Sequence, residues 1–287
     1  MLKTRIVTAL ILLAFLLPAM FAASPVPFAV LTLVLIGAAG WEWSRLNGAP
    51  GVRAVIFGVA LAGLCTFTLI SLGLQSAPPP ALWWLVGLIW VLGGCQALRA
   101  GPAGWPRLAP GLRLLLGALA LWAAWLALAE AKARGVNFML SVFCLVWMAD
   151  VAAYFGGRAF GRRKLAPAIS PGKSWEGVWS GMAGVLALGL AWAYVIDVRL
   201  AVDSPSVYSL LLINPHADMA LGLLRGVPAL VFLSSMSVVG DLFESLIKRA
   251  VGAKDSSQLL PGHGGVLDRV DALLPVFPLA MALTSLT

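Results

Sequence analysis

Residues 54–74 read AVIFGVALAGLCTFTLISLGL and contain no charged side chain. A run of about 20 apolar residues is long enough to cross the hydrocarbon core of a membrane as a helix. Eight more apolar runs lie at residues 6–23, 26–43, 81–98, 113–130, 136–154, 178–196, 221–240 and 272–286. The pattern predicts an all-α fold, a polytopic transmembrane helical bundle of about nine spans.

The composition of the chain agrees with this fold class. Of 287 residues, 61% are hydrophobic and 11% are charged, whereas soluble chains are about 45–50% apolar and about 25% charged. The difference excludes a soluble enzyme, a disordered protein and a coiled coil, and leaves no room for a separate soluble domain. The three cysteines lie in apolar runs without CxxC spacing, so we expect neither a zinc site nor a disulfide framework.

The placement of basic residues predicts the orientation of the spans. With the N-terminus in the cytoplasm, 16 of the 20 Lys and Arg residues fall in cytoplasmic segments. This asymmetry follows the positive-inside rule and favours nine spans with the C-terminus outside. Lys3 and Arg5 before the first apolar run leave a cleaved signal peptide as an alternative. In the nine-span arrangement the four basic residues on the outer side are Lys132, Arg134, Arg199 and Arg225.

Acidic and basic residues collect in or beside two segments, 150–177 and 241–271. Charged groups near membrane depth are costly and indicate a functional site, although ordinary solvated loops are the alternative. We therefore divide the chain into N-terminal membrane spans 1–5 (residues 1–135) and catalytic spans 6–9 (residues 136–287) with cytoplasmic loops 155–177 and 241–271. The acids concerned are Asp150, Glu176, Asp241, Glu244, Asp255, Asp268 and Asp271.

The first loop has features of an anion site. Pro171 and Gly172 predict a turn, and Ser174 is placed to cap the helix that follows. A helix N-terminus beside Lys173 attracts phosphate groups. The segment is not a P-loop, because proline stands at position 167 where that motif requires glycine.

The second loop has features of a metal and phosphate site. Asp268 and Asp271 are one helical turn apart, so both carboxylates are expected to point the same way and bind Mg²⁺. Their alternative role is to complement a helix dipole. Residues 261–265, read PGHGG, let backbone N–H groups approach an anion. His263 either contacts substrate there or is structural. The combination suits phosphoryl or nucleotidyl transfer.

The second loop also resembles a known family signature. It reads Ser245-x-Ile247-Lys248-Arg249-x4-Lys254-Asp255-x-Ser257-x2-Leu260-Pro261-x-His263-Gly264-Gly265-Val266-x-Asp268-Arg269-Val270-Asp271. This pattern resembles that of the phosphatidate cytidylyltransferases, or CDP-diacylglycerol synthases. The first loop is similar to the same family from Lys164 to Trp175, and the close resemblance covers about residues 147–277.

The resemblance implies a reaction and its requirements. CTP and phosphatidate give CDP-diacylglycerol and pyrophosphate, for phospholipid biosynthesis, with magnesium (Mg²⁺) required and potassium (K⁺) as a second cation. It also implies a homodimer in a lipid bilayer, with no nucleic acid as partner. The expected location is the inner (plasma) membrane of a bacterium, with the active site facing the cytoplasm.

The resemblance also implies roles for individual residues. The metal-centre and catalytic carboxylates are Asp241, Asp268 and Asp271, and Lys254 is a catalytic candidate in contact with phosphate. The candidates for binding substrate are Lys173, Ser174, Arg249, His263, Gly264, Gly265, Asp255 and Arg269, with Glu176 as a further candidate.

Three other readings remain open. A CTP-using kinase or cytidylyltransferase that acts on a polyprenyl or archaeal lipid would use the same chemistry, although the full signature argues against it. A transporter of an anionic solute would have its charges near the bilayer midplane instead of at one face. A catalytically inactive scaffold of the same family is the third, and the intact Asp241, Asp268 and Asp271 argue against it.

Overall fold

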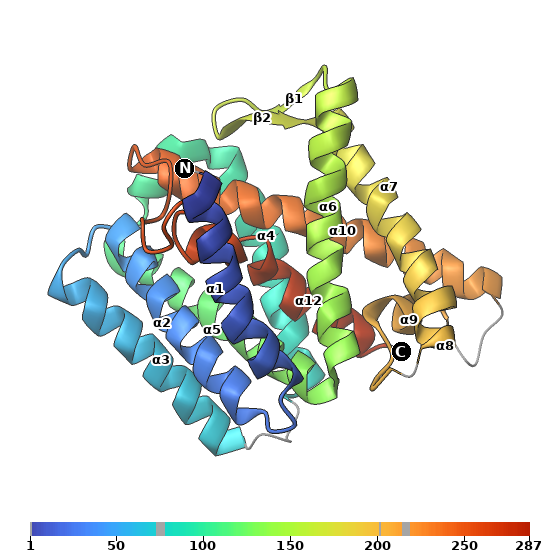
Figure 1. The fold of residues 1–287 in the computed structure, drawn as a ribbon. Helices are drawn as coiled ribbons and strands as arrows, with labels where there is room; N and C mark the ends of the chain where they lie inside the picture. The colour runs from blue at the N-terminus through green and yellow to red at the C-terminus, as the bar shows by residue number, and fades with distance from the viewer. Residues whose placement is uncertain (1, 73–77, 201, 214–218) are drawn as a thin grey trace.

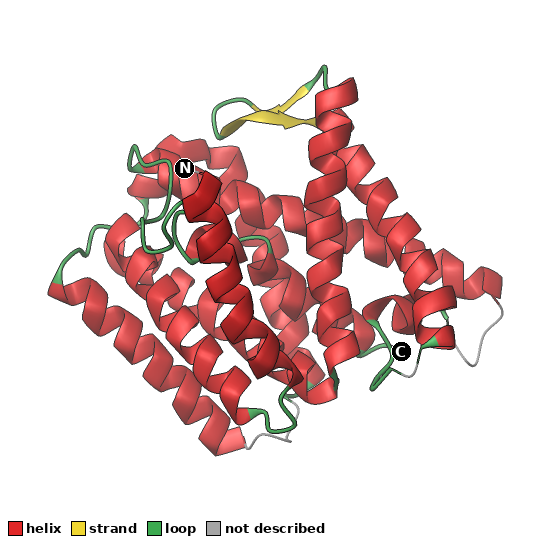
Figure 2. Ribbon diagram, in the orientation of Figure 1, coloured by secondary structure: helices red, strands yellow, loops and turns green. Residues whose placement is uncertain are grey.

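The computed structural model describes residues 2–72, 78–200, 202–213 and 219–287. In these residues the chain is a helical bundle with one two-stranded hairpin at one end (Figures 1 and 2). The elements are, in chain order, α1 (Leu2–Phe21), α2 (Val26–Leu46), α3 (Val52–Leu72), α4 (Pro80–Gly104), η1 (Trp105–Arg107), α5 (Pro110–Arg134), α6 (Val136–Phe160), β1 (Lys164–Ala166), β2 (Ser170–Ser174), α7 (Trp175–Ala191), η2 (Trp192–Ile196), α8 (Asp197–Arg199), α9 (Val207–Leu212), α10 (Met219–Ala250), α11 (Leu267–Val270) and α12 (Leu273–Thr284).

Long apolar helices confirm a polytopic helical membrane protein. Among the described residues, seven helical segments are long and apolar enough to cross a membrane. The apolar part of α1 is shorter, at Ile6–Phe21, and α12 has only 12 residues. In the described residues, nine helices overlap the nine predicted runs, of which residues 73–74 lie outside the described part of the chain, but length and composition qualify seven of these helices as spans. The seven are Val26–Leu46, Val52–Ser71, Pro80–Arg107, Pro110–Arg134, Val136–Phe160, Trp175–Arg199 and Met219–Ala250.

Helix α12 forms the centre of the bundle. Ten of its 12 residues are buried, and it packs against α4, α5, α6 and α10. At about 1.5 Å per residue it is roughly 18 Å long, which is less than the roughly 30 Å hydrocarbon thickness of a bilayer. The contact with α4 is close, because a Cβ on Gly87 would lie 2.7 Å from Leu279 Cδ2. The helix begins two residues after Asp271 and so fixes the position of that acid.

The segment between α6 and α7 is a β-hairpin, which the all-α prediction did not include. Strands β1 and β2 pair antiparallel, with Lys164 opposite Ser174 and Ala166 opposite Ser170. The predicted turn at residues 171–172 is wrong, because these residues belong to β2 and the turn occupies residues 167–169. A two-stranded sheet consists of edge strands, where the missing N–H of a proline is tolerated.

Ser174 caps α7, as the sequence predicts. Its side-chain oxygen accepts a hydrogen bond from the backbone N–H of Gly177, at 3.2 Å. Small residues then let α7 lie close to α6. A Cβ on Gly177 would lie 2.9 Å from the carbonyl oxygen of Ala153. The hairpin is therefore anchored to two tightly packed helices.

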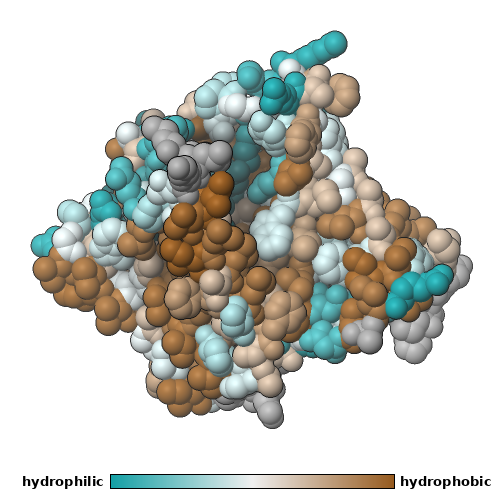
Figure 3. All heavy atoms as spheres, in the orientation of Figure 1, coloured by the Kyte–Doolittle hydropathy of each residue, from teal (hydrophilic) through white to brown (hydrophobic). Residues whose placement is uncertain are grey.

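Polar residues gather at the end of the molecule that bears the hairpin. Figure 3 shows hydrophobic residues over the sides of the bundle and hydrophilic residues around a hollow below the hairpin. The start of α1 lies at the same end, because Thr8 Oγ1 donates to the carbonyl oxygen of Pro261 at 2.9 Å. The long helix α10 crosses behind α6 in the view of Figure 1 and carries Asp241 and Glu244 of the candidate site.

Candidate active site

The hairpin and α10 bring the first pair of predicted site residues together. Lys173 on β2 forms an ion pair with Asp241 on α10. Ser245, one turn later on α10, lies 3.4 Å from the other oxygen of Asp241. Arg249 Nε donates to the carbonyl oxygen of Ile169, at 3.3 Å, and so ties the hairpin turn to α10. The side chains of Lys173 and Asp241 are 26% and 27% exposed, so both are open to a ligand.

Asp271 approaches Asp241 from a different part of the chain. Its backbone lies against α10, since a Cβ on Gly240 would be 2.5 Å from the carbonyl oxygen of Asp271. Burial and the negative charges of Asp241 and Asp150 raise the pKa of Asp271 to about 7. Asp150 on α6, Asp241 on α10 and Asp271 before α12 thus repel one another, and a bound cation would reduce this repulsion.

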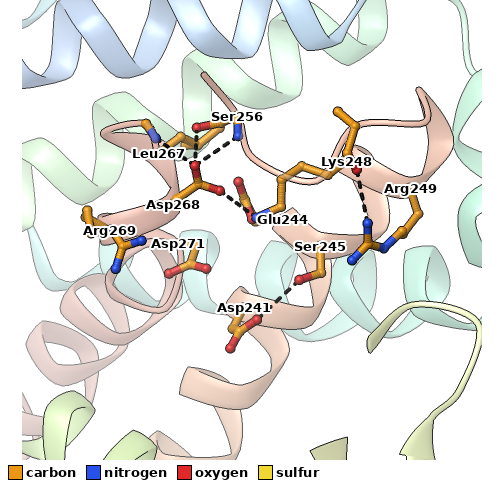
Figure 4. Close-up of polar contacts among 12 residues, drawn as sticks. Asp241, Glu244, Ser245, Lys248, Arg249, Ser256, Leu267, Asp268, Arg269 and Asp271 are labelled. Carbon is orange, nitrogen blue, oxygen red and sulfur yellow. Dashed lines mark hydrogen bonds and ion pairs between the residues drawn. The ribbon is translucent and has the colours of Figure 1, made fainter. Parts of the chain in front are cut away.

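Asp268 lies beside these acids and has different partners (Figure 4). Its Oδ1 accepts from Lys248 Nζ at 2.6 Å, and Lys248 also pairs with Glu244. Its Oδ2 accepts from Ser256 N and Oγ, both at 2.9 Å, and from Gly265 N at 2.8 Å. Burial raises the pKa of Asp268, but these hydrogen bonds outweigh it and lower the pKa to about 2. Asp268 is therefore ionised, with both oxygens engaged by the protein.

The donor set fits a metal ion that is shared with a substrate. No group of three or more His, Cys, Asp or Glu side chains is arranged to hold a metal ion in the described part of the chain. Mg²⁺ usually takes one or two protein carboxylates together with substrate phosphates and water. Asp241 and Asp271 are two hard oxygen donors of this kind, and their mutual repulsion favours a cation between them.

The glycine-rich segment forms a tight turn around Asp268. Leu260 N donates to the carbonyl oxygen of Gly264, and His263 N donates to that of Leu260, both at 2.8 Å. Gly262 and Gly264 have φ values of 77° and 82°, a region that favours glycine. A Cβ on Gly264 would also lie 2.7 Å from Asp268 Oδ2. The glycines thus bring the backbone onto this carboxylate, and a contact of Gly264 or Gly265 with substrate stays a prediction.

The remaining predicted residues are distributed around the acids. His263 Nδ1 is buried without a hydrogen-bond partner in the described residues, while its carbonyl oxygen accepts from Arg269 Nε at 3.0 Å. Lys254 and Asp255 line an open cavity of about 920 Å³ with Trp41 and Arg45, and none of the three predicted metal ligands lines it. A contact of Lys254 with a substrate phosphate in this cavity stays a prediction.

Two predicted residues have structural partners in the first loop. Ser174, a candidate for binding substrate, is the buried cap of α7. Glu176 accepts hydrogen bonds from the N–H groups of Arg162 and Arg163, at 3.0 and 3.1 Å, and forms an ion pair with the Arg163 side chain. Both side chains therefore shape the base of the hairpin.

The sequence analysis missed one acid that reaches this region. Glu42 lies in α2, inside an apolar run, and its carboxylate accepts hydrogen bonds from the segment that precedes Asp268. An ionisable residue within a candidate span is itself a signal of function. Its partners are more than 200 positions away in the chain, so its own stretch of sequence gives no sign of them.

Comparisons with known proteins give the family. The family model described as "Cytidylyltransferase family" matches residues 3–287. A phosphatidate cytidylyltransferase of Pseudomonas aeruginosa is 40% identical, over 99% of this chain and 97% of the relative. Those of Haemophilus influenzae and Brucella suis are 33% and 34% identical, over 97% and 85% of this chain and 96% and 88% of the relatives. The chain therefore belongs to the cytidylyltransferase family, together with these phosphatidate cytidylyltransferases.

Proposed function

We propose that this chain is a phosphatidate cytidylyltransferase, which transfers CMP from CTP to phosphatidate and releases pyrophosphate. The observation that carries the proposal is the meeting of Asp241, Asp271 and Lys173 at one polar end of an apolar bundle. Phosphatidate presents its phosphate at the membrane surface while its acyl chains stay in lipid, and CTP arrives from water. A site at the ends of membrane helices is accessible to both substrates.

The proposed roles follow from charge. Asp241 and Asp271 would hold Mg²⁺, which when bound neutralises the charge of two phosphate groups. Lys173 is held in place by the hairpin, so it binds a CTP phosphate and fixes the orientation of that phosphate. For Asp268, which the resemblance also gives as a metal ligand, we propose a different role, because both of its oxygens already accept hydrogen bonds from the protein: it holds Lys248 and the glycine-rich turn in place. A general base is not needed, because the phosphatidate oxygen that attacks the α-phosphorus of CTP is already ionised at pH 7.

The other predicted roles complete the proposal. Arg249, Lys254, His263 and Arg269 bind phosphate or nucleotide groups around the acids, and residues 136–287 supply the catalytic groups. Potassium is the proposed second cation. A homodimer is proposed from the resemblance alone, and a mass measurement of the protein in lipid nanodiscs would test it.

The proposed topology has nine membrane segments with the N-terminus and the active site in the cytoplasm. The charge distribution supports it, as does the contact of Thr8 with Pro261 at the polar end. Helix α12 begins near Asp271 and ends where Arg134 Nη1 donates to Thr284 Oγ1, at 2.9 Å. Arg134 is the last residue of α5, and α6 separates it from the proposed cytoplasmic loop 155–177. The bacterial relatives support an inner-membrane location.

The activity is tested with purified protein in detergent, short-chain phosphatidate, Mg²⁺ and CTP labelled on its α-phosphate. We expect label to move into the organic phase only when Mg²⁺ is present. Transfer of a γ-phosphate label instead would identify a kinase, and transfer only to polyprenyl or archaeal lipids would identify a different acceptor. Folded protein that transfers no label to any of these lipids would overturn the proposal and lead to transport assays.

The Lys173→Ala variant is expected to raise the KM for CTP. A hydrogen bond to a charged group is worth about 1.5–3 kcal/mol, so the increase should be about 10–100-fold. Steady-state rates at varied CTP concentration measure it. Lys132→Ala is the matched control, because Lys132 Nζ donates to the carbonyl oxygen of Met20, which lies at the far end of α1. An unchanged KM in Lys173→Ala would remove Lys173 from the phosphate site.

A single cysteine in the hairpin tests the orientation. In a variant with Cys65, Cys95 and Cys144 replaced by serine, Ala168→Cys places a thiol on the exposed hairpin turn. We expect a membrane-impermeant maleimide to label it only after the inner membrane is opened. Leu200→Cys is exposed just after α8 and should be labelled in intact spheroplasts. The opposite pattern would reverse the proposed topology.

A further inference from the structure

Glu42 is a fully buried acid whose hydrogen bonds all come from one distant segment. Its side chain is 0% exposed in α2. Its Oε1 accepts from Ser257 Oγ at 2.5 Å and from Val266 N at 3.0 Å. Its Oε2 accepts from Leu267 N at 2.7 Å and from Ser256 Oγ at 3.2 Å. Four donors of the segment 256–267 thus converge on one carboxylate.

The donors are complementary to an ionised carboxylate. All four are N–H or O–H groups, and an ionised carboxylate only accepts hydrogen bonds, at about four lone-pair positions. A buried charge is costly unless hydrogen bonds compensate it. None of the four partners is a cation, so the role of this acid is not to neutralise a base. It holds two backbone N–H groups and two hydroxyls in a fixed arrangement.

The same hydrogen bonds continue to the candidate active site. Ser256 Oγ lies 3.2 Å from Glu42 Oε2 and 2.9 Å from Asp268 Oδ2, and its single hydrogen is shared between the two carboxylates. Asp268 in turn accepts from Lys248 on α10. The N–H groups that Glu42 holds belong to Val266 and Leu267, immediately before Asp268. Glu42 therefore fixes the start of α11 and the acids that follow it.

We infer that Glu42 is a positioning residue for nucleotidyl transfer, an inference that rests on the proposed function. From α2, in the N-terminal half, it holds the segment 256–267 so that Asp268 engages Lys248 and Asp271 faces Asp241. It does not touch the reacting phosphates. Its removal should therefore affect the rate of the chemical step more than the binding of CTP.

A neighbouring glycine supports the inference. A Cβ on Gly265 would lie 2.4 Å from Glu42 Oε1 and 2.0 Å from Ser256 Oγ. A side chain at this position would therefore collide with the Ser256 hydroxyl and with the Glu42 carboxylate that it contacts. Gly265→Ala should displace the same segment and reproduce the effect of losing Glu42.

The test compares Glu42→Gln with the wild-type protein. Glutamine keeps the size of the side chain but turns an NH₂ group toward two donors. We expect kcat to fall about 100-fold, the loss that a displacement of roughly 1 Å in a catalytic site produces. The KM for CTP should stay nearly unchanged, and Glu42→Asp, which keeps the charge, should recover part of kcat. Hydrogen exchange of the peptide 256–267 should become faster in Glu42→Gln.

Glu130→Gln is the matched control. Glu130 is also a buried acid of the N-terminal half, but it binds Trp83 Nε1, at 3.1 Å, and Arg134, away from the candidate site. The Glu130→Gln variant should be less stable, but its kcat per folded molecule and the hydrogen exchange of residues 256–267 should stay at the wild-type values. Thermal unfolding in detergent gives the folded fraction of both variants, by which each kcat is corrected.

The outcomes separate this inference from the proposed activity. A wild-type kcat in Glu42→Gln overturns the positioning role, whether or not exchange becomes faster. A loss of activity equal to the loss of folded protein, as in the control, also overturns it. If the wild-type protein transfers no CMP to phosphatidate, the proposed activity fails. Faster exchange confined to Glu42→Gln would then still support Glu42 as the residue that positions this segment.

Discussion

Asp268→Asn is expected to abolish turnover. Asparagine removes the negative charge that holds Lys248 and turns an NH₂ group toward donors that now bind Asp268. The loss should be at least about 10²–10³-fold, the effect of removing one well-placed electrostatic group from an active site. Transfer of α-labelled CMP to short-chain phosphatidate measures it.

Asp203→Asn is the control for Asp268→Asn. The Asp203 carboxylate accepts from the N–H groups of Val136 and Asn137 at the start of α6, at 2.6 and 2.9 Å, and asparagine retains an oxygen for one of these two contacts, which lie away from the candidate site. It should have a wild-type rate. A rate near that of the wild-type protein in Asp268→Asn would show that neither the metal centre nor the Lys248 contact depends on this charge.

Removal of Mg²⁺ is the second large effect that we expect. Chelation with EDTA should reduce transfer to background, and added Mg²⁺ should restore it, because the negative charges of Asp241, Asp271 and Asp150 act on one another and favour a divalent cation. In Asp241→Asn, the Mg²⁺ concentration for half-maximal rate should rise by at least about 10–100-fold, the loss seen for groups that only orient metal ligands.

Titration of the rate with Mg²⁺ measures this shift directly. Asp203→Asn again serves as the control and should give the wild-type titration curve. Activity that survives EDTA in the wild-type protein would eliminate the divalent ion from the mechanism. An unchanged titration in Asp241→Asn would assign the ion to other ligands.

The helices could be predicted from hydropathy, but the role of α12 could not. Lipid-facing and protein-facing side chains are equally apolar, so hydropathy does not distinguish the run 272–286, which is buried inside the bundle, from runs that face lipid. In the structure α12 is short and buried among α4, α5, α6 and α10. Its central position depends on close contacts such as that between Gly87 and Leu279, which involve distant parts of the chain.

The candidate site could be located from the sequence, whereas its pairings could not. The density of charges identified the two loops, and the spacing of Asp268 and Asp271 suggested one common role. The structure gives them different partners, because Asp268 binds Lys248 and Asp271 lies near Asp241. The pairing of Lys173 with Asp241 spans 68 positions and depends on a hairpin that the sequence analysis read as a turn.

The position of Glu42 has a consequence for biosynthesis. Its nearest partner along the chain, Ser256, follows 214 residues later. At about 5–20 residues per second, the ribosome needs roughly 10–40 s to make that stretch. During this interval α2 is already made, and its carboxylate has none of its native donors. The catalytic arrangement is therefore completed only after residues 256–267 are made, so a chain terminated before them would hold an unpaired acid in a membrane helix, which is costly in lipid.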